Sequence, residues 1–207
     1  MIELYSDSSP NGFKATIALE ETGLDYTLHH IQIEQGEHRG ADFLKLNPHG
    51  RIPVITDSTT GIVLFESAAI LLYIAEKSGQ LLPKSFAERW QALQWLQFHS
   101  SSMGPIFGQR VHFEIFAETK LQPAITRYQK LTNDIYQVLN QRLSNAEYFA
   151  GSEYSIADIA AFGWTHIAQI CGFNFDHYPY LSNWHQKIAA RPAVLRGIAL
   201  PQPAIGP

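Results

Sequence analysis

The sequence predicts a two-domain protein, with an α/β domain over residues 1–82 and an all-helical domain over residues 87–207. Two observations support this division. Short β-rich segments alternate with helical segments as far as Leu82, whereas strand patterns vanish after Phe86 and only helical spacing remains. Pro83 stands between the two parts and interrupts the helical pattern. The length of 207 residues allows two small domains.

The first domain is expected to follow the order β-α-β-α-β-β-α around a mixed sheet. Its strands are recognised by apolar runs or by alternation of apolar and polar residues, and its helices by apolar residues on one face. Asn47-Pro48 closes the second helix, because the residue before a proline resists the helical conformation. The expected elements are Ile2–Tyr5, Pro10–Thr22, Tyr26–Ile33, Gly40–Leu46, Ile52–Thr56, Ile62–Phe65 and Ser67–Ser78.

The second domain shows apolar residues at helical spacing throughout. The expected helices are Phe86–Ser100, Pro123–Leu143, Ser155–Cys171 and Pro179–Ala190, with a loop at 100–109 and a proline-rich tail at 200–207. The third of these helices is apolar on nearly every face, which suits the centre of a helical bundle. It begins with Ser155-Ile156-Ala157-Asp158, an S-x-x-D capping box that we interpret as structural rather than catalytic.

The composition excludes several classes of function. A net charge of -4 argues against a nucleic-acid binder, and a charged fraction of 16% argues against charge-driven disorder. Cys171 is the single cysteine, so the chain cannot form an internal disulfide, a CxxC redox pair or a thiolate zinc site, and we expect its thiol to be inert. The nine histidines show no metal-ligand spacing, so no metal is expected. No signal peptide or membrane-spanning stretch is evident, and the expected location is the cytoplasm.

The segment between the first strand and the first helix reads Ser8-Ser9-Pro10-Asn11-Gly12. Pro10 favours a first helical turn, which places Ser9 and Asn11 at a helix start. Free backbone N–H groups and the helix dipole make such a start suitable for an anion, such as a thiolate or a carboxylate. Plain capping of the helix is the alternative, and this segment alone does not exclude it.

Two further segments of the first domain suit a peptide-like ligand. In Gly50-Arg51-Ile52-Pro53-Val54, a cis Pro53 would turn the backbone N–H and C=O of Val54 toward the ligand. In Phe65-Glu66-Ser67, a strand runs into a helix, where Ser67 can bind a carboxylate and Glu66 can accept from an ammonium. Glu66 and Ser67 together match an α-amino-acid head group, although a capping pair is the structural alternative.

These segments resemble the cytosolic glutathione transferase superfamily over essentially the whole chain. The resemblance rests on IPV with Pro53, on ESAAILLYIAEK from Glu66, and on the YSIADIA box from Tyr154. More narrowly, SPNG, NPHGRIPVI, LFESAAILLYIAEKSG and MGPIFGQ are similar to the bacterial Nu-class enzymes, a group close to the transferase domain of the yeast nitrogen-regulation prion protein. The resemblance implies a thioredoxin-like first domain, glutathione as co-substrate, and disulfide-bond reduction with weak conjugating activity.

The resemblance also implies which residues bind glutathione. The implied residues are His38, Arg51, Ile52, Pro53, Val54, Glu66 and Ser67. The backbone of Val54 would pair with the cysteinyl part of glutathione. Glu66 and Ser67 would hold the γ-glutamyl head group, and His38 and Arg51 would contact the glycyl end.

The chain must hold a borrowed thiolate if it performs thiol chemistry with glutathione. We expect Asn11, together with Ser9 and the helix start, to donate hydrogen bonds that lower the pKa of the glutathione thiol. Ser9 stands where the Nu pattern usually has threonine, so the hydroxyl is kept but its rotamer is less fixed. Ser9 and Tyr5 remain alternative activators, because other transferase classes use a serine near the first helix or a tyrosine at the end of the first strand.

The resemblance further implies a second ligand pocket and a dimer. Met103, Phe107, Arg110 and His112 are expected to line the pocket for a small electrophile, a disulfide or a second ligand. We expect a homodimer, with neither nucleic acid nor membrane as a partner. The expected function is attack of the glutathione thiolate on a disulfide or an electrophilic carbon. A non-catalytic binding or regulatory protein that keeps the fold is the alternative.

Overall fold

The computed structural model describes residues 1–201, which divide into two compact units. The first unit combines Met1–Leu82 with the segment that starts at Ala190, and the second unit is Pro83–Ala189. Residues 190–201 therefore belong to the first unit and not to the expected second domain of residues 87–207. The part of the predicted tail beyond residue 201 lies outside the described residues.

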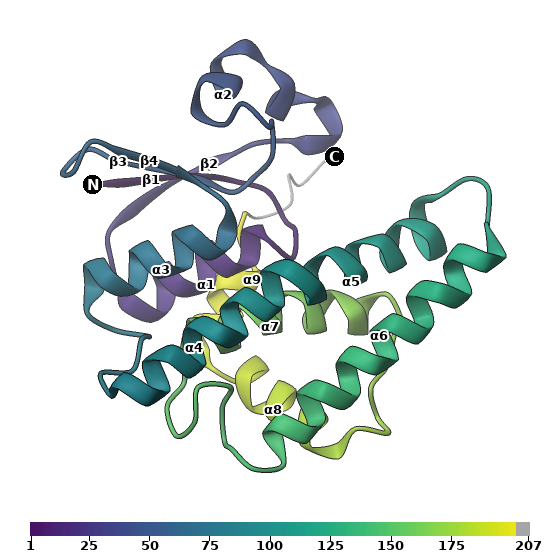
Figure 1. Ribbon diagram of the computed structural model, residues 1–207. Helices are drawn as coiled ribbons and strands as arrows, with labels where there is room; N and C mark the ends of the chain where they lie inside the picture. Colours follow the sequence, from purple (N-terminus) through teal and green to yellow (C-terminus); the bar gives the residue numbers. More distant parts are fainter. Residues whose placement is uncertain (202–207) are drawn as a thin grey trace. The chain divides into compact units, whose positions relative to one another are not determined.

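The first unit is built on a four-stranded mixed sheet in the order β2-β1-β3-β4. Strand β1 pairs parallel to β2 and antiparallel to β3, which in turn pairs antiparallel to β4. Helices α1 and α3 lie on one face of this sheet and α2 on the other (Figure 1). The elements are β1 Ile2–Ser6, α1 Gly12–Thr22, β2 Tyr26–His30, η1 Ile33–Gln35, η2 Glu37–Arg39, α2 Ala41–Leu46, β3 Val54–Asp57, β4 Ile62–Phe65, α3 Ser67–Ser78 and α9 Pro192–Ile198.

Helix α9 was not expected from the sequence, and it packs tightly against α1. A Cβ on Gly197 would lie 2.7 Å from the Ile17 Cα, so only glycine allows the two helices to approach this closely. The Thr16 hydroxyl donates to the Gly197 carbonyl at 2.7 Å across this contact. Arg191 adds a two-pronged ion pair with Glu21, at 2.6 and 2.9 Å. These contacts explain why the chain after Ala190 belongs to the first unit.

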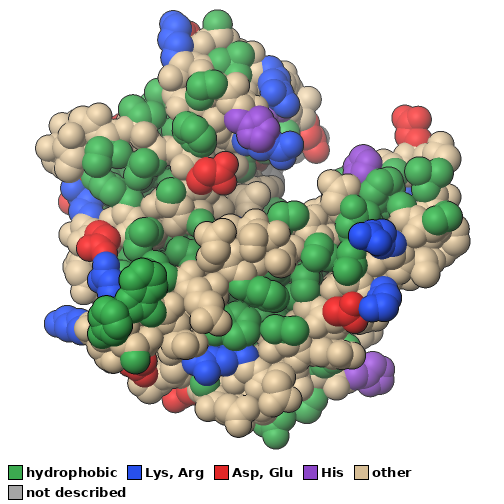
Figure 2. All heavy atoms as spheres, viewed as in Figure 1, with side chains coloured by type: hydrophobic (Ala, Val, Ile, Leu, Met, Phe, Trp, Pro, Cys, Tyr) green, Lys and Arg blue, Asp and Glu red, His purple; other side chains and the backbone are tan. Residues whose placement is uncertain are grey.

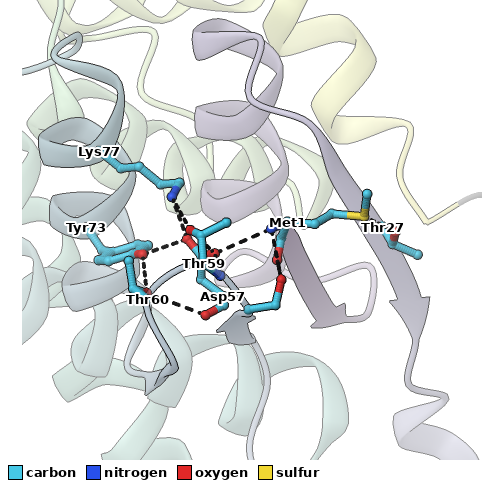
Figure 3. Close-up of polar contacts among 8 residues, drawn as sticks. Met1, Thr27, Asp57, Thr59, Thr60, Tyr73 and Lys77 are labelled. Atoms are coloured by element: carbon cyan, nitrogen blue, oxygen red, sulfur yellow. Dashed lines mark hydrogen bonds and ion pairs between the residues drawn. The ribbon is translucent and has the colours of Figure 1, made fainter.

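Asp57, at the end of β3, anchors α3 to the sheet (Figure 3). Its buried carboxylate accepts hydrogen bonds from the Tyr73 hydroxyl and the Lys77 ammonium of α3, each at 2.7 Å. Thr59 donates from its N–H and its hydroxyl, and the terminal ammonium of Met1 lies 3.6 Å away. Burial opposes the charge, but the hydrogen bonds from Lys77, Tyr73 and Thr59 outweigh it and hold the pKa of Asp57 well below its usual range. The C-terminal half of α3 is thereby fixed relative to β3.

The second unit is helical, so the predicted fold class, an α/β domain followed by a helical domain, is confirmed. The elements are α4 Phe86–Phe98, η3 His99–Met103, α5 Gly104–Val111, η4 His112–Phe116, α6 Gln122–Leu143, α7 Ile156–Ile170 and α8 Pro179–Ala189. The loop expected at 100–109 is instead a π-helical turn followed by α5. Pro105 lies in the first turn of α5, directly after the π-helical turn, and does not stop the helix.

The predicted capping box at the start of α7 is confirmed. The Ser155 hydroxyl accepts from the Ala157 N–H, and the Asp158 carboxylate accepts from the Ser155 N–H at 3.0 Å. The same carboxylate also accepts from the Phe149 N–H at 3.1 Å and from the Trp184 indole N–H at 2.9 Å. Both Ser155 and Asp158 are fully buried, so these groups hold α7 in the core of the second unit.

Uncharged side chains dominate the face of the molecule drawn in Figure 2, and the charged ones are scattered among them. This distribution agrees with the low charged fraction of 16%. Among the described helices, none combines the length and the apolar character that crossing a bilayer requires.

Candidate functional site

The start of α1 follows a sharp turn from β1, and Gly12 is essential to that turn. A Cβ at Gly12 would stand 2.2 Å from the Asp7 carbonyl oxygen, so no other residue fits here without rearrangement. The Ser9 hydroxyl accepts from the Gly12 N–H at 2.9 Å. Ser9 therefore caps the helix, as the structural alternative expected. A capping serine keeps its own O–H free to donate to a ligand.

Asn11 occupies the N-cap position of α1 but makes no capping hydrogen bond with its side chain. Its amide oxygen instead accepts from the Lys14 ammonium at 2.7 Å. Within residues 1–201, the Asn11 amide nitrogen has no protein acceptor. An amide donor at a helix start is thus left for a ligand.

Lys14, which was not among the residues expected at the site, is fully buried, and this is rare for lysine. Its ammonium also lies 3.4 Å from the Ser67 hydroxyl at the start of α3. Burial lowers the pKa of Lys14 well below its ordinary value, while the negative charge of Glu66 acts in the opposite direction. A signal was present in the sequence, because Lys14 is the one charged residue among the apolar first two turns of its helix.

Helix α3 begins at Ser67, and the residue before it has an unusual backbone. Glu66 has φ of 73°, a left-handed conformation that costs a non-glycine residue on the order of 1 kcal/mol. Its side chain is exposed and makes no capping bond, so the capping pair, the structural alternative, is not formed. This geometry leaves the Glu66 carboxylate and the first N–H groups of α3 available to a ligand.

The segment before β3 has the expected cis peptide bond between Ile52 and Pro53. Val54 follows it and pairs with Tyr5 of β1 and with Phe65 of β4. The starts of β3 and α3 are therefore neighbours, because Phe65 directly precedes Glu66.

His38 and Arg51 lie in the connections that flank α2. Arg51 is exposed and donates from its Nε to His49 Nε2 at 3.3 Å, while Asn47 holds the Arg51 carbonyl at 2.7 Å. His38 is half-buried, and its Nδ1 has no partner among the described residues. Both side chains remain available for a ligand.

Tyr5 has a different environment from Ser9 and Asn11. Its ring stacks on His29 of β2, with ring centroids 4.6 Å apart and an interplanar angle of 14°. In the described part of the chain, the Tyr5 hydroxyl makes no hydrogen bond to Ser9 or Asn11. The structure thus brings together Ser9, Asn11 and Ser67, with Tyr5 packed against the neighbouring strand.

The expected pocket residues of the second unit separate into two groups. Met103 and Phe107 are 0% and 1% exposed, so both side chains lie in the interior of the second unit. Phe107 packs its ring edge-on against Tyr136 and Trp164 in the core of the bundle. They are buried because the segment forms helical turns with an inward apolar face.

Arg110 and His112 lie nearer to the surface of the second unit. The Arg110 guanidinium pairs with Glu114 at 2.8 Å and lies 3.9 Å above the Phe173 ring, so its charge is already engaged. His112 is exposed and meets Phe113 edge-on. Burial raises the pKa of the Cys171 thiol and Arg110 acts against this rise, which fits a thiol of low reactivity.

No group of three or more His, Cys, Asp or Glu side chains in residues 1–201 is arranged to hold a metal ion. The polar groups described above are hydrogen-bond donors at two helix starts. Such groups stabilise an anion that is brought to them.

Comparisons with known proteins find matches to both units of the chain. The family model for the N-terminal domain of glutathione S-transferase matches residues 2–76, and the model for the C-terminal domain matches residues 94–192. The disulfide-bond oxidoreductase YfcG of Escherichia coli is 41% identical, over 93% of this chain and 92% of its own.

Two solved structures are also similar to this chain. A glutathione transferase from Burkholderia graminis with two glutathione molecules bound per subunit has a TM-score of 0.90 and 38% identity, covering 97% of this chain and 88% of its own. A glutathione transferase from Pseudomonas putida with one glutathione disulfide per subunit has a TM-score of 0.90 and 37% identity, covering 97% and 91%.

Proposed function

Because the chain belongs to the glutathione S-transferase family, we propose that it is a glutathione-dependent disulfide-bond reductase with a secondary conjugating activity. The observation that carries the proposal is the Asn11 amide donor left unused at the start of α1, beside the start of α3. Residues 1–82 form the proposed glutathione-binding domain. The name of YfcG and the glutathione disulfide bound by the Pseudomonas relative favour disulfides over other electrophiles.

The proposed contacts with glutathione follow the arrangement of the first unit. Ser67 and Glu66 take the γ-glutamyl head group, since one can donate to its carboxylate and the other can accept from its ammonium. The backbone of Val54 pairs with the cysteinyl part, in the segment that begins with Ile52 and Pro53. His38 and Arg51 face the glycyl end. This assignment places the glutathione sulfur near the start of α1.

Asn11 is the proposed activator of the thiol, with the Ser9 hydroxyl as a second donor. Hydrogen bonds to the thiolate lower the pKa of a thiol, which is about 8.5 for free cysteine. A decrease of about two units corresponds to about 2.7 kcal/mol, which two or three charge-assisted hydrogen bonds can provide. Tyr5 is a weaker candidate, because its ring is stacked on His29.

The proposed reaction consumes two glutathione molecules for each disulfide. The first glutathione thiolate attacks one sulfur of the substrate disulfide, forms a mixed disulfide and releases one substrate thiolate. A second glutathione thiolate attacks the glutathione sulfur of the mixed disulfide and releases the other substrate thiolate. The products are glutathione disulfide and two thiols, whose protons come from the two glutathione thiols. Two glutathione molecules per subunit in the Burkholderia relative fit this stoichiometry.

The proposal is tested by two assays on one preparation of the full chain. Reduction of a small disulfide by glutathione is expected to exceed conjugation of an aryl halide by at least tenfold in kcat/KM. The reverse ranking would make conjugation the main activity. Absence of glutathione binding in calorimetry would contradict both enzyme assignments and favour the non-catalytic alternative.

A homodimer in the cytoplasm is proposed as the working form. Each unit exposes an apolar surface that a partner would cover, formed by Ile62, Val63 and Phe65 on β4 and by Phe86 and Trp90 on α4. Sedimentation of the wild type is expected to show a dimer, and of Trp90→Glu a larger monomer fraction. The cytoplasm is the compartment in which glutathione keeps thiols reduced.

A further inference from the structure

The buried Lys14 has no role in the reaction as proposed so far, yet it contacts two of the residues assigned to glutathione. Its ammonium is 2.7 Å from the Asn11 amide oxygen on α1 and 3.4 Å from the Ser67 hydroxyl oxygen on α3. The side chain is fully buried, and Glu66 is the acidic residue that interacts with it. One cation therefore lies behind both helix starts.

The chemistry of the ammonium determines how its two neighbours are oriented. A lysine ammonium has three donors and no acceptor, so the amide of Asn11 must present its oxygen to Lys14. The amide nitrogen, with its two N–H groups, is then directed away from Lys14. In the same way, the Ser67 oxygen accepts from Lys14, which leaves its O–H to donate elsewhere.

We propose that Lys14 is a positioning residue, which orients the polar side chains of the glutathione site so that they donate hydrogen bonds to the ligand. By occupying the acceptor atoms of Asn11 and Ser67, it directs an N–H group toward the glutathione thiolate and an O–H group toward the γ-glutamyl carboxylate. Without it, Asn11 is free to rotate and present its oxygen to the thiolate, which would repel the charge. This inference rests on the proposed function and assigns a cause to the lowered pKa of the thiol.

The test measures the pKa of the enzyme-bound glutathione thiol from the ultraviolet absorbance of the thiolate. Lys14→Met keeps an unbranched side chain but removes every donor, and it is expected to raise the thiol pKa by about one unit, the effect of one charge-assisted hydrogen bond. Lys14→Gln retains an uncharged N–H donor and is expected to cause a smaller rise. In an Asn11→Ala background, Lys14→Met is expected to change the thiol pKa little, because Lys14 acts through Asn11.

Thr16→Val is the matched control for a merely structural role. Thr16 is also buried on α1, and its hydroxyl donates to the Gly197 carbonyl, away from Asn11 and Ser67. This variant is expected to lower stability in urea unfolding while the thiol pKa stays at the wild-type value. An equal rise in the thiol pKa for Thr16→Val and Lys14→Met would overturn the inference, because general destabilisation would then explain both.

The remaining outcomes separate this inference from the proposed function. If wild-type protein binds glutathione with a lowered thiol pKa and Lys14→Met shows the same pKa, the positioning role is wrong and the proposed function stands. If wild-type protein does not bind glutathione, both are overturned. Should Lys14→Met fail to fold, Lys14→Gln decides alone: a partial rise supports the inference, and a wild-type pKa overturns it.

Discussion

The starts of α1 and α7 carry similar polar residues but use them in opposite ways. At α7, the Asp158 carboxylate accepts from Ser155, Phe149 and Trp184, and every one of these groups is buried. At α1, the Asn11 amide accepts from Lys14 and its nitrogen is left without a protein partner in residues 1–201. The polar groups at the start of α7 satisfy one another within the protein. The start of α1 keeps an N–H donor whose expected partner is an anion.

This difference shows how a helix start that binds a ligand can be told from one that is only capped. Both starts read as polar residues before an apolar run, so composition does not separate them. What separates them is the direction of the hydrogen bonds. A capping group turns its acceptor toward the helix, whereas Asn11 turns its acceptor toward a buried cation.

Replacing the carboxylate at the start of α7 is expected to have the largest effect. Asp158→Ala leaves the indole N–H of Trp184 and the N–H groups of Phe149 and Ser155 buried without an acceptor. The free energy of unfolding should fall by about 3–5 kcal/mol. Urea unfolding measures this loss, while the thiol pKa of bound glutathione should stay unchanged. A loss below about 1 kcal/mol would mean that the capping box is dispensable.

The two buried aspartates predict opposite dependences of stability on pH. Burial raises the pKa of Asp158 to about 6, although hydrogen bonds from Phe149, Trp184 and Ser155 oppose the rise. The folded state thus binds this proton more tightly than the unfolded state, and the contribution of Asp158 is lost as the pH rises from about 4 to about 6. The loss is on the order of 2–3 kcal/mol.

Asp57 acts in the other direction, because its lowered pKa adds stability above about pH 4 that is lost on further acidification. Unfolding of wild-type protein and of Asp158→Asn between pH 3 and 7 separates the two contributions. In the variant, the loss of stability on raising the pH from 4 to 6 should disappear. The loss of stability on lowering the pH below 4 should remain. If the stability of Asp158→Asn still falls as the pH rises from 4 to 6, another group causes that fall.

Removing the Asn11 amide at the start of α1 is expected to affect both activity and stability. Asn11→Ala removes one hydrogen bond to a thiolate, which is worth about 1.5–3 kcal/mol, so kcat for disulfide reduction at saturating glutathione should fall roughly 10- to 100-fold. The free energy of unfolding should fall as well, by about 1–3 kcal/mol, because the buried Lys14 loses the acceptor at 2.7 Å. Unchanged turnover would remove Asn11 from the mechanism and leave Ser9 and Tyr5.

The sequence was sufficient for much of the fold and for part of the site. The four strands and helices α1, α2 and α3 followed from apolar patterns, and the box at Ser155 followed from local spacing, because both depend on neighbours in the chain. Helix α9 was missed, since its tight contact through Gly197 depends on α1, far away in sequence. The segment at 100–109 was expected to be a loop, and the structure shows helical turns that bury Met103 and Phe107.

Lys14 was overlooked because a lone lysine on a helix is usually exposed, and only the folded chain shows that it is buried beside Asn11. Lys14 and Ser67 are 53 positions apart in the sequence, so local patterns could not indicate that the two side chains meet. The candidate residues of the first unit came from family resemblance and local pattern together. Only the structure shows that Lys14 lies behind them.

The smallest expected effect tests whether Ser9 is more than a cap. Its hydroxyl accepts from the Gly12 N–H at 2.9 Å, so Ser9→Ala should lower the free energy of unfolding by about 1 kcal/mol, as for other N-terminal caps. The same change should raise the pKa of the bound thiol by less than Asn11→Ala does, because the hydroxyl is shared with the helix. Urea unfolding and thiolate titration on Ser9→Ala and Ser9→Thr measure both effects, and Ser9→Thr should restore both. A larger rise in thiol pKa for Ser9→Ala than for Asn11→Ala would make Ser9 the main donor, and the start of α1 would then serve as cap and site through the same hydroxyl.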